Sequence, residues 1–196
     1  MFIQYVKAIN HIEKKWSGGI TTELFISPLK SSYAERNFDF RISTATVEAE
    51  ETVFTSLPTI KRTLMVLDGK MTLEHENQHQ SNLGKFDIDR FDGEWKTKSI
   101  GKCSDFNLMT RGNTDGDMVG KFIEKGEFIE QTSAKETKLF IYGIAGKMTV
   151  HVNEIEYFIE KGDLLTFETE VETHLTIFGN VDSEFVEVVV FDRRIH

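Results

Sequence analysis

Polar side chains that could bind a small anion recur at alternating positions of segments that otherwise resemble β-strands. Arg41 and Ser43 lie two residues apart among apolar neighbours, and Asp105 and Asn107 repeat this spacing. Alternate residues of a strand point to one face, so each pair is expected to share a face. Arg62 adds a second guanidinium at the start of an apolar run. Because a guanidinium can hold a carboxylate through two parallel hydrogen bonds, this set predicts a carboxylate site.

A second cluster near the start of the chain could complete such a site. Thr21 and Glu23 share a face if their segment is extended, and Trp16 could stack on a flat ligand. The alternative is structural: Trp16 is an ordinary core aromatic, and each arginine faces water or pairs with Asp105 or Glu23 to hold strands together.

The histidines do not have the spacing of a metal site in a β-barrel. Such a site typically needs two histidines two residues apart, so that both imidazoles face inward, and the chain has no His-x-His. His75 and His79 flank a polar turn and are expected to be solvated, and His174 has no evident partner beyond Glu172. We therefore expect no bound metal and no cofactor.

Nucleophilic and phosphate-binding motifs are also missing from the sequence. The single Cys103 excludes an intramolecular disulfide, has no neighbouring histidine, and is expected to be a small buried residue. The sequence has no Gly-x-Ser-x-Gly elbow, and its Gly18-Gly19 pair lacks the Lys-Ser/Thr ending of a P-loop. No catalytic residue is assigned.

Composition limits the partners. The net charge is −9 at pH 7, which argues against binding to nucleic acid or to an anionic membrane. The N-terminus lacks the apolar region of a signal peptide, and no apolar run approaches the length of a membrane span, so the expected location is the cytoplasm.

The elements that must position the polar residues are strands. Ten segments have strand character, at residues 38–45, 61–67, 70–75, 105–109, 138–144, 148–152, 157–160, 164–167, 173–178 and 185–191. The phrase at residues 64–73 (LMVLDGKMTL) recurs at residues 141–150 (IYGIAGKMTV), and Asp68-Gly69 within it favours a hairpin turn. A repeat of this length predicts two small β-barrels, one over residues 1–112 and one over residues 113–196. Edges of such sheets can pair between subunits, so a homodimer is considered.

Five phrases resemble, in order, those of the HutD/Ves family of bacterial double-cupin proteins. They are WSGGITTE (16–23), FRISTA (40–45), FTSLPTIKR (54–62) leading into LDG (67–69), FDGE (91–94) and DFNLMTR (105–111). Three positions depart from the family pattern: Ser17 replaces an Asn, Thr22 an Arg and Glu94 an Asp. The resemblance implies an all-β bicupin of two RmlC-like jelly rolls. It also implies a link to histidine utilisation and the binding of an acidic breakdown intermediate such as urocanate or formylglutamate.

The expected function is metal-independent binding of a small carboxylate metabolite, with a regulatory or accessory role. The expected ligand-binding residues are Trp16, Thr21, Glu23, Arg41, Ser43, Arg62, Asp105 and Asn107. Two alternatives remain open. One is an enzyme of the cupin class with Asp105 or Glu23 as general base. The other is a protein-interaction module with an occluded barrel.

Overall fold

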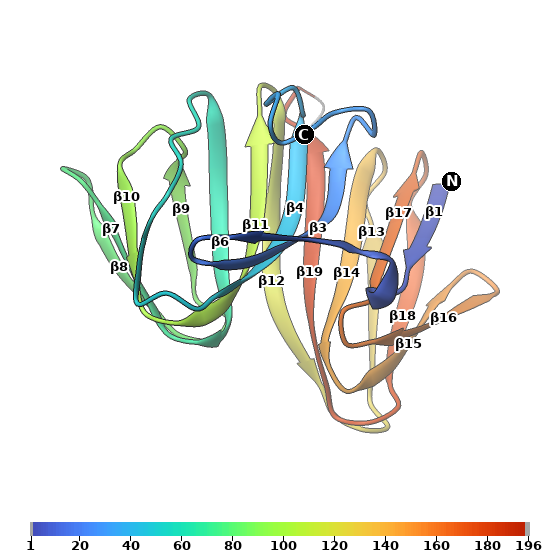
Figure 1. The fold of residues 1–196 in the computed structure, drawn as a ribbon. Coiled ribbons are helices and arrows are strands. Elements are labelled where there is room, and N and C mark those ends of the chain that lie inside the picture. The colour runs from blue at the N-terminus through green and yellow to red at the C-terminus, as the bar shows by residue number, and fades with distance from the viewer. Residues whose placement is uncertain (1, 195–196) are drawn as a thin grey trace. The chain divides into compact units, whose positions relative to one another are not determined.

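In the computed structural model, which describes residues 2–194, the chain consists almost entirely of β-strands (Figure 1). It forms two compact units. One is Ile12–Asp115, and the other combines the chain up to His11 with the chain from Gly116 onward. The expected division at residue 112 lies close to the second of these boundaries. The first eleven residues differ from the expectation, because their strand pairs within the unit built by the C-terminal half.

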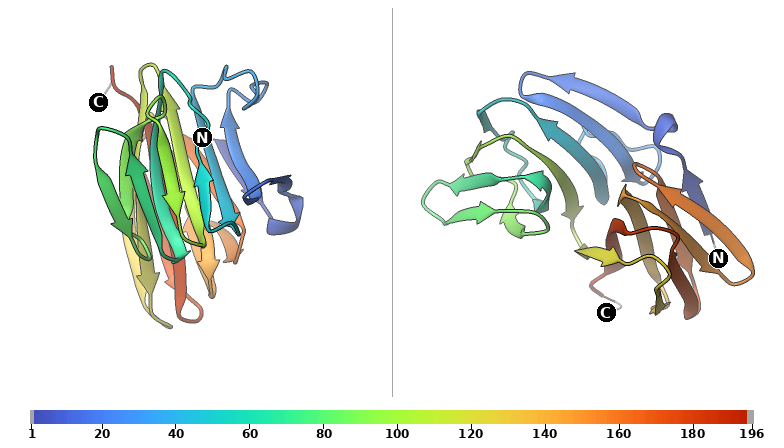
Figure 2. Two further views of the ribbon diagram at one scale, coloured as in Figure 1. Left: turned by 60° about the vertical axis from the view of Figure 1, so that its left-hand side comes forward. Right: turned by 90° about the horizontal axis from the view of Figure 1, so that it is seen from below.

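The unit Ile12–Asp115 is a pair of antiparallel sheets. Its strands are β2 (Ile12–Trp16), β3 (Gly19–Ser27), β4 (Phe40–Val47), β5 (Glu51–Val53), β6 (Ile60–Gly69), β7 (Met71–His75), β8 (Gln80–Leu83), β9 (Ile88–Asp92), β10 (Thr97–Ile100) and β11 (Cys103–Arg111). The larger sheet has the order β2-β3-β4-β11-β6-β9, and the smaller has the order β5-β10-β7-β8. Figure 2 shows the smaller sheet's hairpin of β7 and β8 in green.

One hydrophobic core joins the two sheets of this unit. Leu64 and Val66 of β6 pack in the same buried cluster as Met71 and Leu73 of β7, although β6 and β7 belong to different sheets. β7 alternates between buried and half-buried residues, as expected for a sheet with one apolar face, whereas β6 and β11 are buried along most of their length. The unit is therefore a two-layered sandwich whose sheets shield a shared interior.

The second unit repeats this plan. Its elements are β1 (Phe2–Val6), the short 3₁₀ helix η1 (Ala8–Asn10), β12 (Thr114–Ile123), β13 (Phe128–Ser133), β14 (Thr137–Ala145), β15 (Lys147–Val152), β16 (Ile155–Glu160), β17 (Leu164–Thr169), β18 (Thr173–Gly179) and β19 (Ser183–Asp192). Its sheets have the orders β1-β17-β14-β19-β12 and β13-β18-β15-β16. Each of the ten strand segments expected from the sequence falls on one of the observed strands of the two units.

The repeated phrase forms a corner between sheets in both units. The expected hairpin at Asp68-Gly69 is wrong, because β6 pairs with β9 and β11 whereas β7 pairs with β8 and β10. Gly69 has a φ of 82°, and a Cβ there would lie 2.6 Å from the carbonyl oxygen of Lys102. Gly146 has a φ of 78° at the matching point between β14 and β15. Glycine tolerates this left-handed backbone conformation without steric cost, so the chain can cross from one sheet to the other there.

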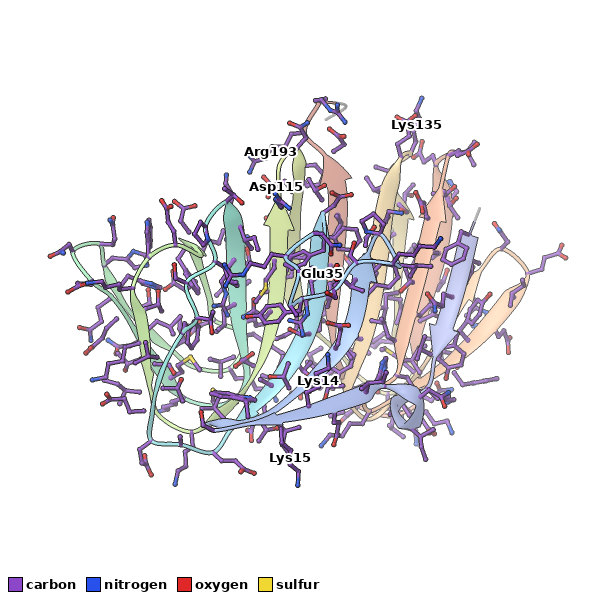
Figure 3. All side chains as sticks on the ribbon, turned by 45° about the horizontal axis from the view of Figure 1, so that its top comes forward. Lys14, Lys15, Glu35, Asp115, Lys135 and Arg193 are labelled. Carbon is purple, nitrogen blue, oxygen red and sulfur yellow. The ribbon has the colours of Figure 1, made fainter. Side chains whose placement is uncertain are left out.

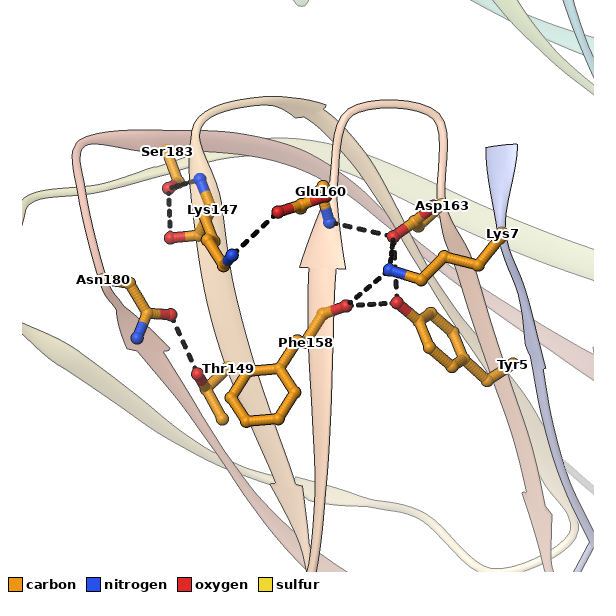
Figure 4. A network of polar contacts seen from close by, with 9 residues as sticks. All are labelled: Tyr5, Lys7, Lys147, Thr149, Phe158, Glu160, Asp163, Asn180 and Ser183. Atoms are coloured by element: carbon orange, nitrogen blue, oxygen red, sulfur yellow. Dashed lines mark hydrogen bonds and ion pairs between the residues drawn. The ribbon is translucent and has the colours of Figure 1, made fainter. Parts of the chain in front are cut away.

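Asp163 ties β1 and the residues that follow it to the rest of the second unit (Figure 4). Its buried carboxylate accepts hydrogen bonds from the Tyr5 hydroxyl and the Lys7 ammonium, each at 2.9 Å, and from the backbone N–H groups of Ala8 at 2.9 Å and Glu160 at 3.1 Å. Burial alone would raise the pKa of Asp163, but these donors hold it below its ordinary value. β1 also pairs along its length with β17, beside which it lies in Figure 1.

Asp163→Asn should destabilise the protein by about 2–3 kcal/mol in denaturant unfolding. The amide has one oxygen fewer to accept hydrogen bonds, so a buried backbone donor at Ala8 or Glu160 loses its partner. The ion pair itself adds little, because the Lys7 side chain is 45% exposed. Glu156→Gln, at an exposed carboxylate of β16, is the control and should change stability by less than about 0.5 kcal/mol. Equal stability of the two variants would contradict this role of Asp163.

Candidate functional site

Four neighbouring strands of the larger sheet in the unit Ile12–Asp115 bring the polar residues together. The order β3-β4-β11-β6 places Glu23 opposite Ser43, and Ser43 opposite Asn107, in a row across three strands. A second row lies two residues along the strands. In it, Met109 of β11 lies opposite Arg41 of β4 on one side and opposite Arg62 of β6 on the other. The spacing of two residues seen in the sequence thus becomes one shared face of a sheet.

This face lines a cavity of about 320 Å³ within the unit. All eight residues expected at the site contribute to its wall, namely Trp16, Thr21, Glu23, Arg41, Ser43, Arg62, Asp105 and Asn107. The sequence analysis did not assign several further wall residues, among them Lys14, Lys15, Tyr33, Phe54 and Met109. Phe54 could have been found, because it opens the phrase that ends at Arg62. Tyr33 comes from an irregular loop and carried no pattern that would have marked it.

Arg41 is held by partners from its own sheet. Its Nε donates to Glu23 Oε2 at 2.7 Å, and one terminal nitrogen donates to Ser43 Oγ at 2.9 Å. Its guanidinium carbon also lies 4.7 Å from the centre of the Tyr33 ring. The charge of Arg41 is therefore already balanced by Glu23, as the structural alternative from the sequence expected.

Arg62, unlike Arg41, has no polar partner in the part of the chain that the structure describes. Its side chain is buried, it makes no hydrogen bond or ion pair among residues 2–194, and its Nε is an unpartnered buried donor. Its guanidinium carbon lies 4.5 Å from the Phe54 ring centre and 5.1 Å from that of Phe91, so two aromatic faces support the charge. Burial lowers the pKa of Arg62 to about 10, and the Asp105 charge only partly offsets this effect. The group remains a cation at neutral pH.

Asp105 and Asn107 complete the polar wall on β11. Both side chains are buried, and burial raises the pKa of Asp105 to about 7, although the nearby Arg62 charge opposes the rise. A large fraction of Asp105 is therefore protonated at neutral pH and can donate a hydrogen bond. The Oδ1 atom of Asn107 is a buried acceptor without a partner among the described residues. Buried polar atoms are usually satisfied, so this wall has unused hydrogen-bonding capacity.

The electrostatic balance of the cavity favours an anion. Glu23 cancels Arg41, and Asp105 is partly neutral, which leaves the charge of Arg62. Lys14 and Lys15, both on β2 and labelled in Figure 3, are exposed cationic residues among those that line the cavity, and their side chains point to opposite sides of the strand. The protein carries a net charge of −9, so this cationic cavity is a local exception to its acidic character.

Cys103 and His75, which were expected to lie outside any site, are both buried, but burial was expected only for Cys103. Cys103 is buried, as expected, and burial raises the pKa of its thiol to about 12, so it is a poor nucleophile. His75, expected to be solvated, is instead buried with only 4% exposure. The expectation was wrong because the turn after β7 folds back, so that His75 packs between His79, Phe91 and Trp95.

Paired antiparallel sheets around a polar cavity are typical of proteins of the cupin type, and the comparisons with known proteins point to this class. The family model HutD matches residues 8–183, so the chain belongs to the HutD family, which is associated with histidine utilisation. The expected resemblance and the all-β cupin-like fold are thereby confirmed. No curated protein sequence matches the chain.

Several solved structures are similar in fold. A conserved protein of unknown function from Pseudomonas aeruginosa PAO1 has a TM-score of 0.86 at 17% identity, covering 98% of this chain and 100% of that one. HutD from Pseudomonas fluorescens SBW25, solved in a formate condition, has a TM-score of 0.71 at 19% identity, covering 95% and 98%. A cupin 2 conserved barrel domain protein from Leptotrichia buccalis has a TM-score of 0.58 at 10% identity, covering 96% of each chain. Among the described residues, no helix is long and apolar enough to cross a membrane.

The two arginines should respond oppositely to replacement by methionine. Arg62→Met removes a buried charge whose lowered pKa corresponds to a cost on the order of 3 kcal/mol, and it should raise stability by about 1–2 kcal/mol once the lost aromatic contacts are counted. Arg41→Met leaves Glu23 and Ser43 without their donor and should lower stability by about 1–2 kcal/mol. Thermal and denaturant unfolding of both variants measure the difference. A loss of stability in Arg62→Met as large as that in Arg41→Met would show that Arg62 is a structural group.

Proposed function

We propose that this protein binds a small carboxylate metabolite in the cavity of the unit Ile12–Asp115, without the help of a metal, in an accessory or regulatory role. The observation that carries the proposal is Arg62, a buried guanidinium that contacts aromatic rings but no anion of the protein. A buried charge is costly unless it is paired, and a ligand carboxylate would supply the missing partner. Arg41 is the weaker candidate, because Glu23 and Ser43 already occupy it.

The rest of the wall indicates what else the ligand carries. The free acceptor at Asn107 Oδ1 favours a ligand with an N–H or O–H donor, and protonated Asp105 can donate to a second ligand oxygen. Trp16, Tyr33 and Phe54 offer aromatic surfaces for a flat group. A cavity of about 320 Å³ suits a metabolite rather than a polymer. Urocanate has a carboxylate for Arg62, a ring N–H for Asn107 and a planar ring for the aromatic wall. Formylglutamate has a carboxylate and an N–H donor but no planar ring.

A carboxylate should bind to the metal-stripped protein and lose affinity when the charge of Arg62 is removed. We expect Arg62→Met to weaken urocanate or formylglutamate binding by about 30- to 1000-fold in titration calorimetry, because a bidentate charged contact is worth roughly 2–4 kcal/mol. Urocanate methyl ester, which lacks the anion, is the matched control ligand and should bind the wild type as weakly as urocanate binds the variant. Formate, used with the Pseudomonas fluorescens protein, serves as a minimal carboxylate probe. Unchanged affinity in Arg62→Met would refute the assignment.

The affinity should also depend on pH through Asp105. The carboxylate ligand binds beside this residue, so the neutral form of Asp105 is favoured in the complex. Its pKa of about 7 in the free protein means that binding is strongest below pH 7 and weakens by about tenfold for each pH unit above it. Asp105→Asn should bind with little pH dependence between pH 6 and 8. A wild-type affinity that rises with pH would contradict this arrangement.

The same carboxyl group supports a second candidate function. A general base works best when its pKa lies near the working pH, and Asp105 meets this condition inside a cavity that could hold a substrate. Incubation with urocanate, formylglutamate and related acids, followed by NMR, would reveal a product. Product formation that disappears in Asp105→Asn would favour an enzyme, whereas unchanged metabolites with measurable binding would favour the binding protein. No response to any small molecule would favour the interaction module.

A further inference from the structure

We propose that His75, His79 and Asp89 form a binding site for a divalent transition metal ion, best suited to Zn²⁺, that is separate from the carboxylate cavity. None of the three residues lines that cavity. In the described part of the chain they are a group of metal-ligating side chains whose donor atoms all lie within 4.8 Å of one another. The proposal is independent of the proposed function, because the two sites share no residue.

The local fold aims the three side chains at one point. The turn after β7 closes through hydrogen bonds from the backbone N–H of His75 to the carbonyl of His79 at 2.9 Å and from that of Gln78 to the carbonyl of His75 at 3.0 Å. Asn77 takes the left-handed conformation in this turn, with a φ of 61°. The two imidazole rings therefore lie next to each other, with centres 4.5 Å apart and planes tilted by 42°. Asp89 reaches them from β9, which belongs to the opposite sheet.

One carboxylate serves both imidazoles. Nε2 of His75 lies 3.0 Å from Asp89 Oδ2, and Nε2 of His79 lies 3.0 Å from Asp89 Oδ1. Two nitrogen donors and one carboxylate are a ligand set that Zn²⁺ uses when a fourth position stays open. Oδ2 of Asp89 lies 3.0 Å from Nε2 of His75 and 3.2 Å from Nε2 of His79, close to the separation of about 3.3 Å between two ligands of a tetrahedral Zn²⁺. Imidazole ligands disfavour Mg²⁺ and Ca²⁺, which prefer oxygen.

A second layer of contacts orients the buried ligand. Nδ1 of His75 lies 2.8 Å from the hydroxyl oxygen of Thr97, and this hydroxyl can donate to the carbonyl of Trp95 at 3.4 Å. With a metal ion on Nε2, Nδ1–H would donate to this hydroxyl, whereas in the metal-free protein Nε2–H donates to Asp89. Metal-binding histidines characteristically donate their other ring N–H in this way.

Exposure gives the ion an entry side. The His75 side chain is fully buried and that of Asp89 is 7% exposed, whereas that of His79 is 40% exposed. An ion arriving beside His79 would keep one position for water, while His75 and Asp89 would hold it from the buried side. Because His75 and Asp89 belong to different sheets, the bound ion would also link the two layers of the sandwich.

The test is a titration of the metal-stripped full chain, produced without a polyhistidine tag, with ZnCl₂. We expect one Zn²⁺ per chain by titration calorimetry and by metal analysis after dialysis, with a rise of several degrees in Tm at saturation. His79→Gln and Asp89→Asn should each weaken binding by more than about 100-fold, and Thr97→Val, which removes only the orienting contact, by about 10- to 100-fold. Co²⁺ should quench the fluorescence of Trp95, whose ring centre lies 5.6 Å from that of His75 and 5.8 Å from that of His79.

His174→Gln is the matched control, because His174 is an exposed histidine of the other unit, where its Nδ1 lies 2.9 Å from the Thr132 hydroxyl. This variant should bind Zn²⁺ as the wild type does. Two results would overturn the proposal: the wild type fails to bind Zn²⁺ at millimolar concentration, or His79→Gln and Asp89→Asn bind it as tightly as His174→Gln. The wild-type measurement needs no variant to fold, and His79 is exposed enough for its replacement to be tolerated. Carboxylate binding to the metal-stripped protein is a separate readout, so failure here leaves the proposed function untouched.

Discussion

The buried, unpaired charge of Arg62 is the constraint around which the unit Ile12–Asp115 is organised. A guanidinium in this position lowers stability unless something compensates for its lost hydration. The aromatic rings of Phe54 and Phe91 provide part of that compensation. The charge of Arg62 also lowers the pKa of Asp105, but the two groups form no ion pair. A direct pair between Arg62 and Asp105 would have neutralised both groups. Because they form no such pair, both side chains could still interact with a bound ligand.

The two arginines of this sheet differ in their partners: Arg41 is hydrogen-bonded to side chains of the sheet, whereas Nε of Arg62 has no partner among the described residues. The row Glu23, Ser43 and Asn107 crosses three strands in register, and Arg41 satisfies the first two of these residues. That pairing holds β3 against β4 and forms a fixed wall. Arg62 enters from β6, on the far side of β11, where no acidic residue lies opposite it. Arg41 is thus neutralised within the sheet by Glu23, whereas Arg62 leaves an unpaired positive charge at the cavity.

Much of this could be read from the sequence, and the remainder depended on contacts between distant segments. Alternation along single strands was enough to place Arg41 with Ser43 and Asp105 with Asn107, and the quoted phrases were enough to name the family. Alternation could not say which arginine was paired, because Glu23 lies eighteen positions away from Arg41 in the chain. Nor could it show that the Gly69 turn joins two sheets, that the first strand belongs to the second unit, or that Asp89 meets His75. Each of these depends on which strands become neighbours after folding.

His75, His79 and Asp89 come together although no two of them lie on the same strand. Spacing along one strand detects only ligands that share a strand face, and by that criterion His75 and His79 are merely polar residues near a turn. A hairpin that closes tightly brings residues four apart into contact, just as one turn of helix does, and a neighbouring sheet can then supply the third ligand. The cavity that contains Arg62 and the cluster of His75, His79 and Asp89 are therefore two separate polar places in the same pair of sheets. The ring of Phe91 contacts both, lying 5.1 Å from the Arg62 guanidinium carbon and 4.6 Å from the His75 ring centre. Phe91 is thus a neighbour of both places, although it belongs to neither set of polar groups.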